Sequence, residues 1–166
     1  MKSSYSFEKF NRHVSLWRKL MATLWLLPAW FAPHYKLRVM FHKWRGVNIV
    51  GKRVFIGYYC TLDNVHPEQI TIEDDVAIGA NSVVISHDDY SGWALNDCES
   101  SIKPVLFKRC SAIGIGTMVM PGVTLGENAV VGAYSYVNRN VPANTLCVMP
   151  RKPFSIELPP KEERST

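Results

Sequence analysis

Residues 113–137 read IGIGTMVMPGVTLGENAVVGAYSYV, and this stretch repeats every six residues. An aliphatic residue begins each hexad, and a small or β-branched residue stands four places after it. A helix has a period of 3.6 residues and an ordinary strand a period of two, so a strict six indicates an internal structural repeat. The aliphatic positions are Ile113, Val119, Leu125, Val131 and Val137, and the small positions are Thr117, Val123, Ala129, Ser135 and Val141.

The same repeat extends toward the N-terminus with two interruptions. After Leu62 the spacing lengthens to ten residues, which predicts a short loop that bulges from the repeat. A longer insertion, residues 88–104, lacks the six-residue pattern, and Phe107 restores the register. The other upstream hexads begin at Val50, Ile56, Ile72, Ile78 and Val84.

A six-residue unit is long enough for one short strand and one bend. Three units make a triangular turn, and the inward aliphatic side chains of successive turns stack on one another. Parallel strands in neighbouring turns satisfy each other's backbone hydrogen bonds. Glycines that follow the aliphatic residue, such as Gly57 and Gly114, are expected at bends with unusual dihedral angles. The sequence therefore predicts an all-β domain, a parallel β-helix over residues 46–150, followed by a tail over residues 151–166.

Residues 1–45 precede the repeat and are predicted to be largely helical. Trp17, Leu20 and Leu24 share one helical face within residues 14–31, so this segment is expected to form an amphipathic helix. Its apolar run is too short to span a bilayer, and Pro28 interrupts it. Two compatible roles remain open: the helix caps the open end of the repeat, or it lies on a membrane surface with its tryptophans at the interface. A second short helix is expected over residues 35–45.

Charge and cysteine usage narrow the classes of partner. The chain of 166 residues has a net charge of +5 and a pI near 9.1, with many basic residues early in the sequence. This favours an anionic partner such as a membrane surface or a phosphorylated cofactor, and the absence of a nucleic-acid motif argues against nucleic acid. The four cysteines and five histidines are dispersed without a CxxC pair, so we expect no metal site. Cys60 and Cys110 occupy small positions of the repeat and are expected to be buried thiols in a reducing compartment.

The repeat with its glycines, the segment 113–137 and the sequence Ile85-Ser-His-Asp88 resemble the hexapeptide-repeat acyltransferases. The resemblance covers about residues 46–152 and is closest to the sugar O-acetyltransferases of bacterial surface-polysaccharide synthesis. It implies a left-handed parallel β-helix, a homotrimer with active sites between subunits, and acetyl-CoA as the acyl donor. The handedness comes from the resemblance alone, because right-handed crossovers are the general rule.

His87 is the candidate general base. Acetyl transfer to a hydroxyl needs a base with a pKa near neutrality, and imidazole suits this task. His87 stands where the hexads stop and the long insertion departs, and the resemblance implies this role for it; the alternative is a histidine that only hydrogen-bonds within its own loop. Asp63 follows Leu62 in the preceding turn, at a position where galactoside-type relatives carry an asparagine. It is expected either to orient the imidazole or to cap its own turn before Asn64.

The resemblance also implies residues that bind the two substrates. The pantetheine arm of CoA is expected in a groove between subunits, and its nucleotide end is expected at basic residues past the last turn. Carried over by position, these residues are Ile115, Ala133, Asn138, Arg139 and Lys152. The long insertion offers acidic and aromatic groups to a sugar acceptor, namely Asp88, Asp89, Tyr90 and Trp93.

These features predict a cytoplasmic O-acetyltransferase, peripheral on the inner face of the cell membrane. Its expected acceptor is a hydroxyl of a polysaccharide or lipid-linked saccharide precursor. Two alternatives remain: an acetyltransferase for a small molecule such as serine, an antibiotic or a free sugar, and a non-catalytic β-helix that serves as an assembly subunit. A metal-dependent hydratase on the same scaffold is disfavoured, because it needs three placed histidines and only His66 and His87 lie in the region of the repeat.

Overall fold

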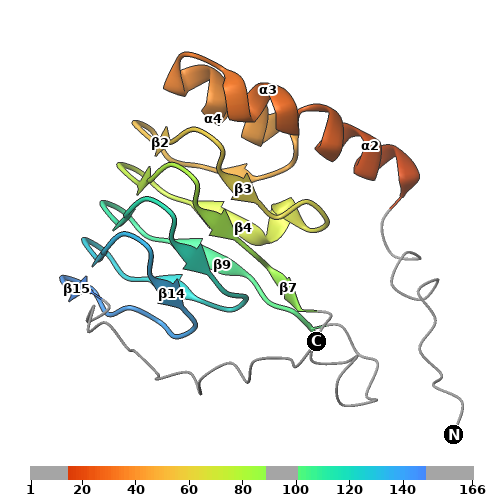
Figure 1. Ribbon diagram of the computed structural model, residues 1–166. Helices are drawn as coiled ribbons and strands as arrows, with labels where there is room; N and C mark the ends of the chain where they lie inside the picture. Colours follow the sequence, from red (N-terminus) through yellow and green to blue (C-terminus); the bar gives the residue numbers. More distant parts are fainter. Residues whose placement is uncertain (1–14, 89–100, 149–166) are drawn as a thin grey trace, which may run out of the picture.

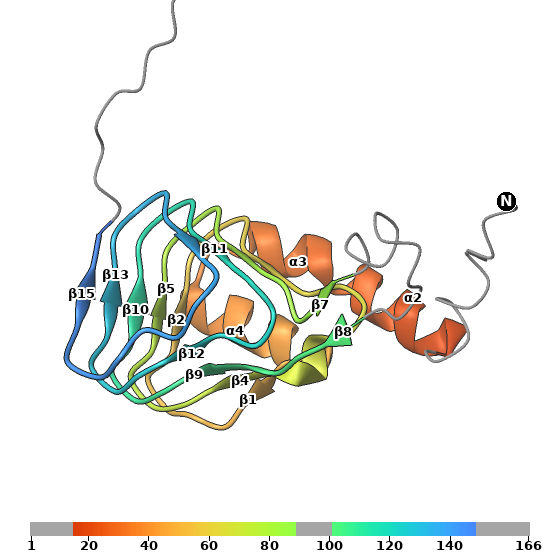
Figure 2. The ribbon, with the colours of Figure 1, turned by 90° about the horizontal axis from the view of Figure 1, so that it is seen from below.

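The chain forms a coil of short strands covered at one end by helices (Figure 1). The computed structural model describes residues 15–88 and 101–148. Three parallel sheets make the sides of the coil, and we call them sheets A, B and C in the order in which the chain visits them. Strands that are neighbours in a sheet come from successive turns, which are stacked in one outline when viewed from below (Figure 2). This arrangement fits a left-handed parallel β-helix.

Each sheet is built from strands of two or three residues. Sheet A contains β1 (Asn48–Ile49), β4 (Ile70–Ile72), β9 (Val105–Phe107) and β12 (Thr124–Leu125). Sheet B contains β2 (Phe55–Ile56), β5 (Ala77–Ile78), β10 (Ala112–Ile113), β13 (Val130–Val131) and β15 (Leu146–Cys147). Sheet C contains β3 (Thr61–Leu62), β6 (Val83–Val84), β11 (Met118–Val119) and β14 (Tyr136–Val137).

The core of the coil is filled by the two repeating positions that the sequence singled out. The aliphatic Ile78 and the small Ala129 are both completely buried, and the same holds for nearly all their equivalents. Phe107 pairs in register with Ile72, so the repeat does resume after the long insertion. The prediction was wrong at the first turn, where Ile49 is buried and Val50 is 64% exposed. The inward position there lies one residue earlier than the count of six places it.

The glycines of the repeat serve a purpose other than the predicted one. A Cβ on Gly57 would lie 2.4 Å from the backbone nitrogen of Ala80, and a Cβ on Gly114 would lie 2.4 Å from that of Ala133. These glycines therefore allow adjacent turns to approach closely. The left-handed backbone occurs two residues later, at Gly116 after Gly114 but at non-glycine residues in most other turns, such as Asn81 with φ 57°. Asparagine tolerates this conformation because its short polar side chain can hydrogen-bond locally.

The prediction of buried thiols holds for Cys60 and is wrong for Cys110. Cys60 is fully buried, and burial raises the pKa of its thiol to about 11. Cys110 and Cys147 are only half-buried, since Cys110 lies at a turn between strands and Cys147 lies in the last described strand. Cys98 lies outside the described residues.

From residue 15 onward, three helices precede the coil: α2 (Leu16–Leu24), α3 (Leu26–Phe31) and α4 (Tyr35–Trp44). The single helix expected over residues 14–31 is divided at Trp25, whereas the second expected helix matches α4 to within a residue. The side chains of Trp17 and Leu20 are more than half exposed, and the small Ala22 and Ala29 are buried instead. Within the described ranges, every helix falls short of the length and apolar character that a membrane span requires.

The helices cap the first turn of the coil through hydrogen bonds to its carbonyl groups. In later turns the equivalent carbonyls accept from the preceding turn, as Gly57 N–H donates to Ile78 O. The first turn has no preceding turn, so helix side chains supply the donors. Trp30 Nε1 donates to Cys60 O at 2.9 Å, and Arg38 Nε donates to Ile56 O at 2.7 Å. The capping role expected for the N-terminal segment is therefore filled by polar donors rather than by its large apolar side chains.

Candidate active site at the corner between sheets C and A

His87 lies where the chain leaves the stack of sheets. It begins β7 (His87–Asp88), which follows sheet C and pairs antiparallel with β8 (Ser101–Ile102) outside the coil. Figure 1 shows β7 projecting from the corner between sheets C and A. The side chain of His87 is 18% exposed. The imidazole is therefore held by a rigid corner while part of it still reaches solvent.

The imidazole of His87 contacts the carboxylate of Asp63 from the preceding turn. Leu62 pairs in register with Val84, which brings Asp63 beside the residues that lead into β7. The distance between His87 Nδ1 and Asp63 Oδ2 is 2.6 Å. The structure thus brings these two predicted residues together, while their catalytic roles remain a prediction.

The Asp63 carboxylate makes both kinds of contact that the sequence left open, one with the imidazole and one with its own turn. Its Oδ1 caps the following turn by accepting from the backbone N–H of Val65 at 2.7 Å and of His66 at 2.9 Å. Its Oδ2 accepts from Ser86 N at 2.7 Å and Ser86 Oγ at 2.6 Å, besides His87 Nδ1. One carboxylate therefore joins the turn after β3 to the start of β7.

This network fixes the charge of Asp63 and the tautomer of His87. Burial alone would raise the pKa of Asp63, but the hydrogen bonds from His87, Ser86 and the His66 backbone hold it below its ordinary value of 3.8. Because an ionised carboxylate only accepts hydrogen bonds, His87 must carry its proton on Nδ1. Its Nε2 is then the basic nitrogen that can take a proton from a hydroxyl.

Two neighbours of the pair were missed by the sequence analysis. Ser86 is fully buried, and its N–H donates to Asp63. Its hydroxyl, which has one proton to donate, lies 2.6 Å from Asp63 Oδ2 and 2.9 Å from the backbone oxygen of His66. The ring of His66 lies 5.9 Å from that of His87, and its Nδ1 is 3.2 Å from Glu68 Oε1. The short spacing between Asp63 and His66 was a usable signal for His66, whereas nothing distinguishes Ser86 from other small residues of the repeat.

The predicted CoA-binding residues lie at two different corners of the coil. Ile115 and Ala133 lie one above the other between sheets B and C, where Tyr134 N–H donates to Ile115 O. Asn138 and Arg139 follow sheet C instead, at the same corner as His87 but two turns later in the stack. They line a hollow of about 570 Å³. A single chain does not bring the two pairs together. Lys152 lies outside the described residues.

Most of the predicted acceptor-binding residues cannot be placed. Asp88 is half-buried in β7 opposite Ser101. Asp89, Tyr90 and Trp93 lie outside the described residues. Among residues 15–88 and 101–148, no group of three or more histidine, cysteine or acidic side chains is arranged to hold a metal ion.

Sequence comparisons find relatives over most of the chain. Residues 69–86 and 111–139 match a family described as the hexapeptide repeat of succinyl-transferase. A putative acetyltransferase of Schizosaccharomyces pombe is 36% identical over 112 residues, which cover 66% of this chain and 53% of the relative. The putative colanic acid biosynthesis acetyltransferase WcaF of Escherichia coli is 30% identical over 155 residues, with 81% of each chain covered. The chain therefore spans about half the length of the first relative and most of the second.

Solved structures share the fold. A maltose O-acetyltransferase from Clostridium difficile aligns over 80% of both chains with a TM-score of 0.59 and 21% identity. A hexapeptide-repeat-containing acetyltransferase from Vibrio cholerae, solved with acetyl coenzyme A, aligns over 80% of this chain and 82% of its own with a TM-score of 0.56 and 19% identity. At these identities the likeness concerns the fold alone.

Proposed function

Because this chain belongs to the hexapeptide-repeat acetyltransferases, we propose that it moves the acetyl group of acetyl-CoA to a sugar hydroxyl, with His87 as the general base. The observation that carries the proposal is the hydrogen bond from His87 Nδ1 to the buried carboxylate of Asp63. The name of one relative supports the acceptor class, since WcaF of Escherichia coli is described as a putative colanic acid biosynthesis acetyltransferase. The acceptor class we propose is a polysaccharide or lipid-linked saccharide precursor.

The proposed reaction is a direct transfer without a covalent enzyme intermediate. His87 Nε2 takes the proton of the acceptor hydroxyl while the hydroxyl oxygen attacks the thioester carbonyl. The tetrahedral intermediate then expels the CoA thiolate, and the imidazolium of His87 gives this thiolate the proton that it took from the hydroxyl. Asp63 remains ionised throughout and stabilises the imidazolium that forms between the two steps.

The alternatives make different demands on this corner. A non-catalytic assembly subunit would use the Asp63 carboxylate only as the cap of its turn, and it would have no need of the partly exposed imidazole that contacts this carboxylate. A small acceptor such as serine, an antibiotic or a free sugar would use the same base. The acceptor classes are therefore distinguished by experiment, in which turnover with saccharides is compared with turnover with serine.

The test is the His87→Ala variant, assayed by thiol release from acetyl-CoA with a galactoside, an oligosaccharide or serine as acceptor. We expect kcat to fall by about 10²–10⁴, the usual contribution of a general base. The matched control is His34→Asn, which removes an exposed imidazole but keeps a side chain able to cap α4. Calorimetry should show that His87→Ala still binds CoA. Wild-type turnover by His87→Ala would refute the assignment.

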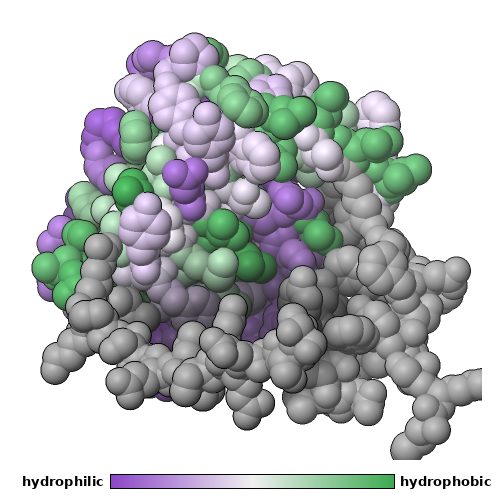
Figure 3. Space-filling view, viewed as in Figure 1, coloured by the Kyte–Doolittle hydropathy of each residue, from purple (hydrophilic) through white to green (hydrophobic). Residues whose placement is uncertain are grey.

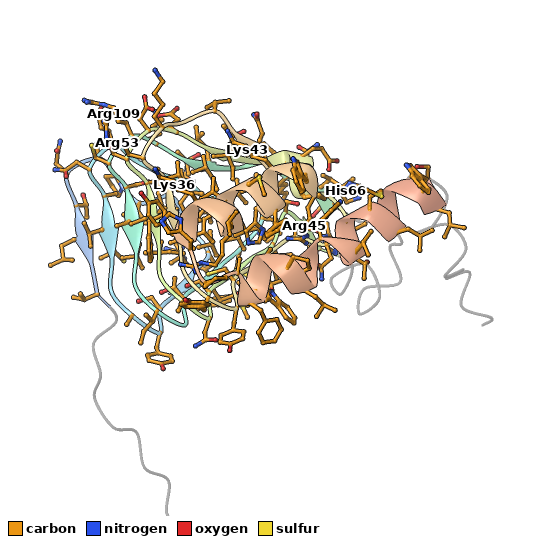
Figure 4. The ribbon with its side chains drawn as sticks, turned by 90° about the horizontal axis from the view of Figure 1, so that it is seen from above. Lys36, Lys43, Arg45, Arg53, His66 and Arg109 are labelled. Carbon is orange, nitrogen blue, oxygen red and sulfur yellow. The ribbon has the colours of Figure 1, made fainter. Side chains whose placement is uncertain are left out.

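We also propose that three copies form a ring in which two different corners meet. The corner between sheets A and B is charged, with ion pairs between Arg53 and Asp75 and between Arg109 and Glu127. Figure 4 shows the two arginines close together at this corner. The corner between sheets B and C is apolar instead, and its exposed residues include Tyr58, Tyr59, Ile115 and Tyr134.

An apolar corner on one copy and the His87 corner on the next would form a heterologous interface, and such an interface makes a ring if the rotation closes. The ring would place Ile115 and Ala133 of one copy near His87 of another. The Tyr134→Asp variant tests this, because Tyr134 is 67% exposed and aspartate tolerates its left-handed backbone. Sedimentation should show trimers for the wild type and for Asn144→Asp at the charged corner, and monomers for Tyr134→Asp. A monomeric wild type would refute the ring.

Peripheral membrane contact through α2 and α3 is our third proposal. Large apolar side chains along these helices are exposed, and Figure 3 shows the apolar surface over this part of the molecule. The net charge of +5, with many basic residues early in the sequence, favours anionic lipid. These exposed side chains are Leu16, Trp17, Leu20, Leu24, Leu27 and Phe31.

Vesicle flotation tests the membrane proposal. The double variant Trp17→Glu/Leu20→Glu should lose binding to vesicles that contain anionic lipid, because it places charge on the face that would enter the headgroup layer. Val50→Glu is the control, since Val50 is an equally exposed aliphatic residue on the coil rather than on the helices. Equal binding by the double variant and the wild type would show that these helices act only as a cap.

A further inference from the structure

Arg45 is a buried cation between the N-terminal helices and the turn that carries Asp63. Its side chain is almost fully buried, and Figure 4 places it between the helices that cover the coil. Nε donates to the backbone oxygen of Ala22 in α2 at 2.8 Å, and Nη1 donates to His42 Nδ1 at 3.0 Å. Nη2 donates to the backbone oxygen of Asp63 at 3.2 Å and to Asn64 Oδ1 at 2.6 Å.

A second buried arginine shows what simple capping requires. Arg38 donates to Ile56 O in the first turn and to Ala32 O in the loop before α4, both at 2.7 Å, and its guanidinium lies 4.0 Å from the ring centre of Tyr58. These contacts do not reach Asp63. Arg45 differs because two of its hydrogen bonds end on the turn that carries the carboxylate. Burial lowers the pKa of Arg45 to about 10, so the guanidinium stays charged at neutral pH and needs these acceptors.

The direction of the Asp63 carboxylate depends on this turn. Asp63 Oδ1 accepts from the backbone N–H of Val65 and His66, so a shift of the turn would move the carboxylate and the imidazole bonded to it. Arg45 holds the same turn from the side of the helices. We propose that Arg45 is a positioning residue. It ties the turn that carries Asp63 to helix α2, and it thereby fixes the orientation of the Asp63 carboxylate and, through that carboxylate, of His87. This inference rests on the proposed function of His87.

The comparison of Arg45→Met with Arg38→Met tests the inference. Both variants remove a buried guanidinium from the cap, so both should lower Tm. Only Arg45→Met should lower kcat for thiol release, by roughly tenfold to a hundredfold, with an unchanged KM for acetyl-CoA, because a misplaced base loses rate rather than CoA affinity. Proton NMR supplies a second readout: the Nδ1–H resonance of His87 should be retained in Arg38→Met and broadened or lost in Arg45→Met.

A milder pair of variants covers the case in which Arg45→Met does not fold. Asn64→Ala removes one acceptor of Arg45 at an exposed residue and should lower kcat severalfold, whereas Asn48→Ala in the same turn of the coil should not. Equal kcat values in the Arg45 and Arg38 variants, or in the Asn64 and Asn48 variants, would overturn the inference. If His87→Ala instead retains wild-type turnover, the proposed function has failed and not merely the role of Arg45.

Discussion

The Asp63→Asn variant separates the charge of the carboxylate from its shape. In the wild type, five hydrogen bonds end on the two oxygens: from Val65 N, His66 N, Ser86 N, Ser86 Oγ and His87 Nδ1. Asparagine has one acceptor oxygen and an NH₂ group that only donates. If the oxygen stays with the turn at Val65 and His66, the NH₂ group faces Ser86 and His87. His87 must then accept on Nδ1, which moves its proton to Nε2 and removes the base.

The size of the effect follows from this tautomer change. Loss of a correctly protonated general base costs about 10²–10⁴ in rate, so we expect kcat to fall at least about a hundredfold with an unchanged KM for acetyl-CoA. The buried N–H of Ser86 also loses its acceptor, which should lower the free energy of unfolding by about 1–3 kcal/mol.

The stability effect should depend on pH with a definite sign. The pKa of Asp63 is lower in the folded protein than its ordinary value of 3.8. Its ionised form therefore stabilises the fold above pH 3.8, and this contribution is lost as the pH falls below that value. The difference in free energy of unfolding between wild type and Asp63→Asn should accordingly be largest near neutrality and should shrink in acid.

Thiol release and urea unfolding at several pH values measure both quantities. Ser86→Ala is the control, because it removes one donor to Asp63 but leaves the charge and the imidazole contact in place. It should keep kcat within about tenfold of wild type. If His87→Ala is inactive while Asp63→Asn keeps nearly full kcat, Asp63 serves only as the cap of its turn and the proposed orienting role is wrong.

Three further outcomes follow from the fold. Gly57→Ala should lower Tm far more than Gly132→Ala, because its new Cβ would meet backbone of the next turn at 2.4 Å, whereas the one on Gly132 would meet a valine side chain at 3.1 Å. Burial and the neighbouring arginines lower the pKa of His42 to about 3, so between pH 6.5 and 3 only the unfolded chain takes up a proton at this residue. The free energy of unfolding should therefore fall as the pH falls through this window, and urea unfolding should show a smaller fall for His42→Asn. Native alkylation followed by mass spectrometry should modify Cys147 well before Cys60, whose thiol is buried.

The inward positions of the coil could be predicted because their period is a property of the sequence alone. Ile113 and its equivalents are buried as the count of six requires. The first turn departs from it because Val50 is an extra residue that turns outward after Ile49. The reason for Gly57 and Gly114 was not predictable from local rules, since the atoms that exclude a Cβ belong to the next turn of the coil.

The sequence could identify the site residues whose side-chain type indicates their chemistry. It could not identify a residue that acts through the helices that cap the coil. An imidazole at the end of the hexads and an acidic residue one turn earlier identified His87 and Asp63, and their contact agrees with that expectation. Arg45 gave no signal, because a basic residue at the end of a short helix usually faces solvent, whereas here it is buried. The positions predicted at residues 89, 90, 93 and 152 stay predictions, since they lie outside the described residues.

The three corners of the coil explain why a single chain should be inactive on the proposed mechanism. Each turn visits all three corners, so one repeat places Ile115 and Ala133 at the apolar corner and His87 at another. No rearrangement of side chains can join groups at two corners of a rigid coil. A dissociated Tyr134→Asp variant should therefore lose both CoA binding and acetyl transfer while its Nδ1–H resonance from the contact of His87 with Asp63 persists. A monomer that still transfers acetyl groups would mean that CoA binds at the His87 corner alone, beside Arg139.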